Sequence, residues 1–72
     1  MKWNCIDLGW RLGSLGDMMM EAISIAELLN TNVSFDFNGV KVTVNKNTSV
    51  LYDQSSIQSA VIDRRQYLNI CR

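Results

Sequence analysis

Residues 33–45 read VSFDFNGVKVTVN, a stretch in which apolar and polar side chains alternate on both sides of an Asn-Gly pair. Such a pair between alternating runs predicts a β-hairpin, because both central residues of a type I′ turn need a positive φ. With Asn38 and Gly39 in the turn, one face of the hairpin pairs Asp36 with Lys41 and is polar. Six apolar side chains share the opposite face: Val33, Phe35, Phe37, Val40, Val42 and Val44. A second element must cover that face.

The segment before the hairpin predicts a helix over residues 18–29, because it is rich in Met, Ala, Glu and Leu. Asp17 is placed to cap the N-terminus of this helix. Apolar side chains surround most of it, and only Glu21, Ser24 and Glu27 form a narrow polar line. A surface helix of a monomer usually has a wider polar face. We therefore expect one stripe to pack on the hairpin and a second stripe to remain as a surface for another chain: Met19, Ile23 and Ala26.

The segment after the hairpin predicts a polar loop over residues 45–49, followed by a brief third strand or a packed connection over 50–52. A second helix is expected over residues 54–68, capped by Asp53 or by one of the serines at 55 and 56. Both helices would lie on one face of the small antiparallel sheet that the hairpin begins. The sequence thus predicts a single α+β domain spanning residues 1–72.

The first 16 residues form an N-terminal strand or arm in this interpretation, and residues 17–72 form a helix–hairpin–helix unit. Glycines at 9, 13 and 16 indicate turns between the two parts. Two tryptophans lie in the arm, Trp3 and Trp10, and tryptophan is enriched among the residues that dominate protein–protein binding. The arm therefore either docks on a partner or forms an ordinary first strand of the sheet.

The charges of the chain disfavour several classes of function. Seven basic and seven acidic residues give a formal net charge of zero, and histidine is absent. The acidic residues are scattered, so we expect no catalytic, metal-binding or cofactor-binding site. The opening residues do not resemble a signal peptide, and no apolar run is long enough to span a membrane. These features predict a cytoplasmic protein.

The two cysteines, Cys5 and Cys71, lie near opposite ends of the chain. Small extracellular domains that depend on disulfides usually carry four or more cysteines. We therefore expect two free thiols, and the alternative is a single disulfide that joins the two ends.

Nucleic-acid binding is an alternative function, and it would use the basic groupings of the chain: Lys41, Lys46, Arg64 and Arg65. Phosphate binding depends on a clustered basic face, which a chain of balanced charge does not favour. A purely structural homo-oligomer is a third alternative.

The segment AISIAELLNTNVSFDFNGVKVTVNKNTS, residues 22–49, joins an Ile/Ala-rich helix to a V-x-F-x-F-N-G-x-x-V-x-V hairpin and a polar loop. This combination resembles short accessory proteins of bacteriophages. The resemblance implies a protein that binds a bacterial host protein in the cytoplasm of the host, as anti-CRISPR and other anti-defence inhibitors do. We therefore expect a non-enzymatic protein–protein interaction module that inhibits or modulates a host protein such as a defence effector, associates with itself as a homodimer, or does both.

Overall fold

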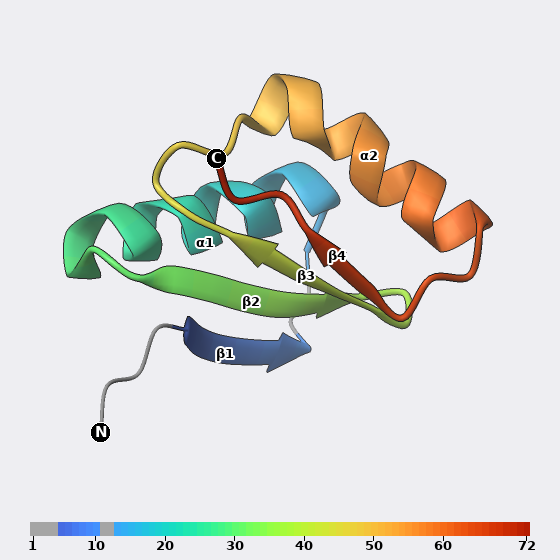
Figure 1. The fold of residues 1–72 in the computed structure, drawn as a ribbon, viewed down its shortest axis with the longest axis horizontal. Helices are drawn as coiled ribbons and strands as arrows, with labels where there is room; N and C mark the ends of the chain where they lie inside the picture. The colour runs from blue at the N-terminus through green and yellow to red at the C-terminus, as the bar shows by residue number, and fades with distance from the viewer. Residues whose placement is uncertain (1–4, 11–12) are drawn as a thin grey trace.

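The computed structural model describes residues 5–10 and 13–72, with only the backbone described at Trp10. The described residues form two helices and a four-stranded sheet, and both helices cover the same face of that sheet (Figure 1). In chain order the elements are β1 (Cys5–Trp10), α1 (Leu15–Leu29), β2 (Asn32–Phe37), β3 (Val40–Val44), α2 (Val50–Ile62) and β4 (Tyr67–Asn69). The predicted α+β class is confirmed. None of the helices in this part of the chain is long and apolar enough to cross a membrane.

The strands stand in the order β1-β2-β3-β4, and the two outer pairs are parallel. Parallel neighbours need a crossover connection, which α1 supplies between β1 and β2 and α2 supplies between β3 and β4. The described sheet is therefore two βαβ units joined by the β2–β3 hairpin. It is mixed, whereas the sequence prediction was a small antiparallel sheet, and only the hairpin pair is antiparallel.

The hairpin has the predicted register. Val33 pairs with Val44 and Phe37 pairs with Val40, and the turn residues Asn38 and Gly39 have φ values of 49° and 87°. Positive φ at both positions is what a type I′ turn requires. Five of the six apolar side chains are buried, and Phe37 is half-buried.

The core lies between this face and the two helices. Met19, Ala22 and Ala26 of α1 are fully buried, and Ile57 and Ala60 of α2 join the same apolar cluster: Leu15, Met18, Met19, Ala22, Ala26, Val33, Phe35, Val40, Val42, Val44, Ile57, Ala60 and Ile70. The small alanine side chains allow the helices to lie close to the strands. Each fully buried large side chain contributes about 1.5–3 kcal/mol relative to exposure.

This packing overturns one prediction about α1. Met19 and Ala26 were expected to remain exposed for a second chain, but both are 0% exposed. Ile23, the third member of that stripe, is half-buried and packs against the core. The prediction is wrong because α1 contacts the sheet and α2 at the same time, so Met19 and Ala26 are covered within the chain.

The N-terminus of α1 also differs from the prediction. The helix begins at Leu15, and its cap is Ser14 rather than Asp17. The Ser14 hydroxyl accepts a hydrogen bond from the backbone N–H of Asp17 at 3.2 Å, as an N-cap side chain does. At the other end Asn30 has a φ of 51°, and this left-handed residue ends the helix.

The bounds of α2 were predicted several residues too late. The helix runs from Val50 to Ile62, so residues 50–52 form its first turn and not a strand. The cap is Ser49, whose hydroxyl accepts from the N–H of Tyr52 at 3.2 Å, and not Asp53 or a later serine. The helix ends before Arg64, which has a φ of 57°, and the last residues of the predicted helix form strand β4 instead.

Candidate interaction surface

The solvent-facing side of α2 carries no charge. The only charged residue of this helix, Asp53, is buried. The exposed residues of the helix, which we call the α2 surface, are Leu51, Tyr52, Ser55, Ser56, Gln58, Ser59 and Ile62. Leu51, Tyr52 and Ile62 are 86%, 77% and 80% exposed. The centres of protein–protein interfaces are depleted of charged residues and enriched in aromatic ones.

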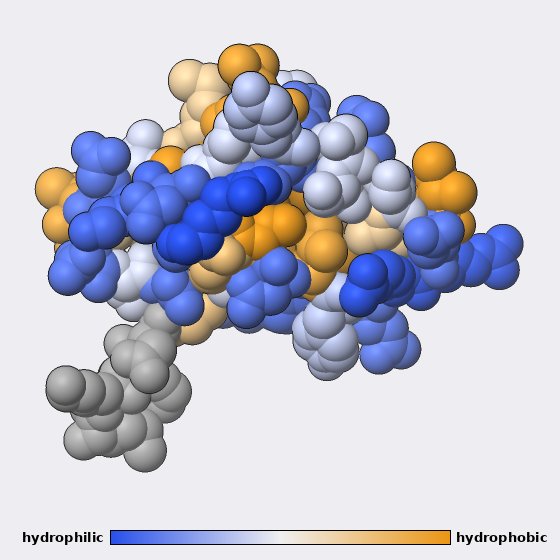
Figure 2. All heavy atoms as spheres, turned by 45° about the horizontal axis from the view of Figure 1, so that its top comes forward, coloured by the Kyte–Doolittle hydropathy of each residue, from blue (hydrophilic) through white to orange (hydrophobic). Residues whose placement is uncertain are grey.

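The apolar members of the α2 surface lie at its two ends. Figure 2 shows the helix-bearing face, with orange apolar atoms at its upper edge and at its right, and with paler atoms between them. Four residues lie on one line along the helix, at spacings of four, three and four, and we call them the Leu51–Ile62 stripe: Leu51, Ser55, Gln58 and Ile62. At 100° per residue they fall within an arc of about 60°. The stripe is a narrow surface with apolar ends and a polar middle.

The inward orientation of Asp53 fixes the outward orientation of its neighbours. The guanidinium of Arg72 donates to both carboxylate oxygens, from Nε at 3.0 Å and from Nη2 at 2.6 Å. The backbone N–H of Ser49 donates to the same carboxylate at 2.9 Å. Because successive helical residues turn by about 100°, this anchor directs Leu51 and Tyr52 toward solvent. The Arg72 hydrogen bonds lower the pKa of Asp53, against the opposing effect of burial.

The loop before α2 holds the same end of the chain. Asn45 donates from Nδ2 to the carbonyl oxygen of Arg72 at 2.9 Å and accepts from its N–H at 3.2 Å. Asn47 donates to that carbonyl at 3.0 Å, and the Thr48 hydroxyl donates to the carbonyl of Ile70 at 2.8 Å. We call these contacts, together with Asp53, the Arg72 clasp. The clasp ties β4 to the first turn of α2 and so keeps the α2 surface in place.

A groove runs beside the α2 surface. It has a volume of about 310 Å³, and small side chains leave its space open. Ser55, Ser56, Ser59 and Ala60 of α2 line it with Leu68 of β4, and Asp63 and Arg65 complete the lining. A groove lined in part by small residues can accept side chains from a partner, so it extends the surface on which contact is possible.

The uncovered face of the sheet presents a different arrangement. Lys41 forms an ion pair with Asp7 of β1 and a second with Asp36, at 3.5 Å. The Lys41 hydrogen bond is the main cause that lowers the pKa of Asp7, and the Asp7 hydrogen bond raises the pKa of Lys41. The Asp36–Lys41 pair was predicted from the hairpin, but the contribution of Asp7 was not, because it depends on the parallel pairing of β1.

The structure brings three of the four predicted nucleic-acid residues toward one end of the sheet and places Lys46 at the other. Lys41 is occupied by two carboxylates. Lys46 lies beyond the end of β3, whereas Arg64 and Arg65 lie in the turn that leads into β4 beside the start of β3. The four basic residues therefore divide between opposite ends of the sheet. A phosphate backbone requires positive charges that are clustered.

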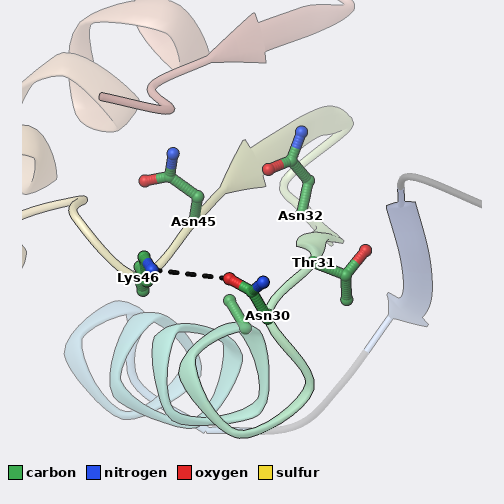
Figure 3. Close-up of a pocket in the computed structure, with 6 residues that line it drawn as sticks. Asn30, Thr31, Asn32, Asn45 and Lys46 are labelled. Carbon is green, nitrogen blue, oxygen red and sulfur yellow. Dashed lines mark hydrogen bonds between the residues drawn. The ribbon is translucent and has the colours of Figure 1, made fainter.

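A small hollow at the end of α1 collects several amide side chains. It has a volume of about 100 Å³ and is lined by Ala26, Asn30, Thr31, Asn32, Asn45 and Lys46. In Figure 3 the Lys46 amine meets Asn30 Oδ1, at 3.4 Å, and Thr31 points away from the other side chains. Asn30 caps α1 and Asn45 belongs to the Arg72 clasp. Most polar groups of the hollow thus have structural roles, although the buried Thr31 hydroxyl has no partner among the described residues.

Both thiols are free in the structure, Cys5 on the surface and Cys71 half-buried. Burial is the main cause that raises the pKa of the Cys71 thiol, and the Cys5 thiol adds to it. Within residues 5–10 and 13–72 no group of three His, Cys, Asp or Glu residues could hold a metal ion.

Two of the predicted interface residues belong to the N-terminal arm. Trp3 and the side chain of Trp10 lie outside the described residues. The exposed apolar residues of α1 are Met20, Leu28 and Leu29, none of which was predicted as interface. Leu51 and Ile62 were missed as well, because the second helix was placed too late. Recognising Ser49 as the cap would have placed both residues on one exposed stripe.

The chain matches no protein-family model, no curated protein and no solved structure. Its function must therefore be inferred from its own residues.

Proposed function

We propose that the protein is a non-enzymatic protein–protein interaction module that contacts its partner through the α2 surface. The observation that carries this proposal is the combination of Leu51, Tyr52 and Ile62, all largely exposed, on a helix whose outer side has no charge. Single exposed apolar residues are common on monomeric proteins. Here three of them share one neutral helix, and the groove beside it offers a shape that a partner can fill.

The energetics support a contact role for these residues. Burying a large apolar side chain contributes about 1.5–3 kcal/mol, so these three residues together offer roughly 5–9 kcal/mol of gross stabilisation to a complex. The cost of association, about 4–15 kcal/mol, offsets much of this gain. The α2 surface alone therefore suits a modest affinity, which contacts in the groove would raise.

The class of partner follows from the likeness of residues 22–49 to phage accessory proteins. That likeness supports a bacterial host protein, such as a defence effector, as the target, with the bacterial cytoplasm as the place of action. Occupying the surface of such a protein would inhibit or modulate it without any chemical step by this chain.

The test is affinity capture from a bacterial lysate, in salt high enough to remove nucleic acid, followed by reconstitution with the purified candidate partner. The test variant is the double substitution Leu51→Glu/Tyr52→Glu, and the matched control is Leu28→Glu on α1, where the leucine is 81% exposed. We expect a stoichiometric protein partner that binds the wild type and the control but not the test variant. Capture of nucleic acid alone, or equal binding by all three proteins, would contradict the proposal.

A further inference from the structure

We infer that the Leu51–Ile62 stripe pairs with the same stripe of a second copy of this chain, across a twofold axis perpendicular to α2. The inference rests on the proposed function, because it names a second copy as the occupant of the stripe and leaves Tyr52 and the groove to another protein. Its basis is the order of side chains along the stripe, which is apolar, polar, polar, apolar at spacings of four, three and four. This pattern has the same form when it is followed from either end of the helix.

A twofold axis requires a surface of that kind. In a twofold interface the same patch is used on both subunits, so that residue i contacts residue j and residue j contacts residue i. When two copies of α2 lie antiparallel with their centres opposed, Leu51 meets Ile62 of the second copy, and this contact occurs twice. Ser55 meets Gln58 of the second copy, again twice. Each apolar end thus finds an apolar end, and each polar residue finds a polar one.

The middle of the stripe suits a close crossing. The serine hydroxyl can donate and accept, and the glutamine amide offers both an acceptor oxygen and donor hydrogens. Ser55 and Gln58 can therefore satisfy each other between the copies when water is removed. The small side chain of Ser55 also lets the two helices approach closely at their centres.

The distribution of charge selects α2 over α1 for this contact. The outer side of α1 exposes Asp17 and Glu27, and an antiparallel pair of α1 helices would bring these acidic residues of one copy near those of the other. Like charges placed against each other across an interface oppose binding. The α2 surface has no charge to oppose its own copy, and a chain of zero net charge has little long-range repulsion between copies.

The size of the stripe sets the strength of the dimer. A helix of 13 residues is about 20 Å long, and two such helices bury less than the roughly 1,200 Å² of a standard stable interface. We therefore expect a reversible dimer with a dissociation constant on the order of micromolar or weaker. Association should depend strongly on concentration.

The experiment is sedimentation equilibrium of the purified protein from about 10 µM to 1 mM, a range that brackets the affinity of a small interface. We expect the average mass of the wild type to rise from that of the monomer toward twice that value. The substitution Leu51→Glu should weaken dimerisation at least about tenfold, because it places a charge against an apolar side chain at both ends. The control Leu28→Glu, at an equally exposed leucine of α1, should dimerise as the wild type does. Circular dichroism verifies that each variant is folded.

A double substitution tests the antiparallel geometry itself. In Leu51→Glu/Ile62→Lys the twofold places opposite charges against each other, so association should recover relative to either single substitution. The two positions are about 16 Å apart along one helix, too far to pair within a chain. A wild type that stays monomeric throughout the range, a control that weakens as much as Leu51→Glu, or a double variant with no recovery would each overturn the inference. The proposed function is tested separately, by the capture of a host protein. A monomeric wild type would therefore overturn the dimer without contradicting the proposed function.

Discussion

Replacing Asp53 by Asn removes one negative charge from the Arg72 clasp and leaves the shape of the side chain nearly unchanged. In the wild type Asp53 is 3% exposed, and its carboxylate accepts from the Arg72 guanidinium and from the Ser49 N–H. A hydrogen bond to a charged group contributes about 1.5–3 kcal/mol. Because solvent reaches the guanidinium and screens the pair, we expect the total loss to lie within that range, about 1.5–3 kcal/mol of the free energy of unfolding.

The same substitution should change how stability depends on pH. The folded pKa of Asp53 is lowered, chiefly by the Arg72 hydrogen bonds. A group with a lowered folded pKa contributes stability that is present above its unfolded pKa, about 3.9 for Asp, and that is lost as the pH falls through the folded value. The wild type should therefore lose more stability than Asp53→Asn between pH 7 and acid, and the two proteins should converge. The pKa of Asp7 is also lowered, but Asp7 contributes equally to the pH dependence of the two proteins because both contain it.

The assay is urea denaturation followed by circular dichroism at pH 7 and at about pH 3. Asp63→Asn is the control, because it removes a carboxylate from an exposed position at the other end of α2, where substitutions usually change stability by less than about 0.5 kcal/mol. Equal stability of Asp53→Asn and the wild type at pH 7 would refute the reasoning. So would a difference between them that is the same at both pH values.

Three further measurements test other parts of the structure. Gly39→Val should lower the free energy of unfolding by about 1–3 kcal/mol, because a β-branched residue resists the φ of 87° found there, and an unchanged thermal unfolding curve would show that the turn is not type I′. Ser49→Ala should lower the free energy of unfolding by about 0.5–2 kcal/mol in urea denaturation, because a helix cap is lost, whereas Ser55→Ala should change it little. A larger loss for Ser55→Ala than for Ser49→Ala would show that Ser49 is not the cap. Cys5 should react with a thiol reagent in the folded protein faster than Cys71, whose thiol is half-buried with a raised pKa. Both thiols should react after denaturation without reductant, and a pair that does not react would show a disulfide.

The hairpin could be predicted from the sequence because its information is local. The Asn38–Gly39 turn and the alternating side chains on either side of it determine the register without reference to the rest of the chain. The parallel pairings of β1 and β4 could not be predicted in this way. They depend on contacts between segments separated by a whole helix. The strand β4 has three residues, too few for a residue pattern that would distinguish it from a continuation of the second helix.

The start of α2 shows how a local pattern can mislead. Val50, Leu51 and Tyr52 were read as a strand or a packed connection, and the predicted caps were Asp53 and the serines at 55 and 56, not Ser49. The deciding contacts are the bond from the Tyr52 N–H to Ser49 and the attachment of Asp53 to Arg72, and the second joins residues far apart in the sequence. The α2 surface was missed for the same reason, since the stripe is visible only when Leu51 belongs to the helix.

The strands occupy the sheet in the order in which they occur along the chain, and this order bears on how the protein reaches its fold. Each strand pairs with the strand that precedes it, so the loop-closure entropy of each step is that of one helix or of one two-residue turn. Folds whose contacts are close in sequence fold faster than those built from distant pairings. A β-hairpin forms in about 1–10 µs, ahead of the helical crossovers that must span more chain. The β2–β3 pair can therefore serve as the template on which β1 and β4 are added, one at each edge, as α1 and α2 collapse onto the same face.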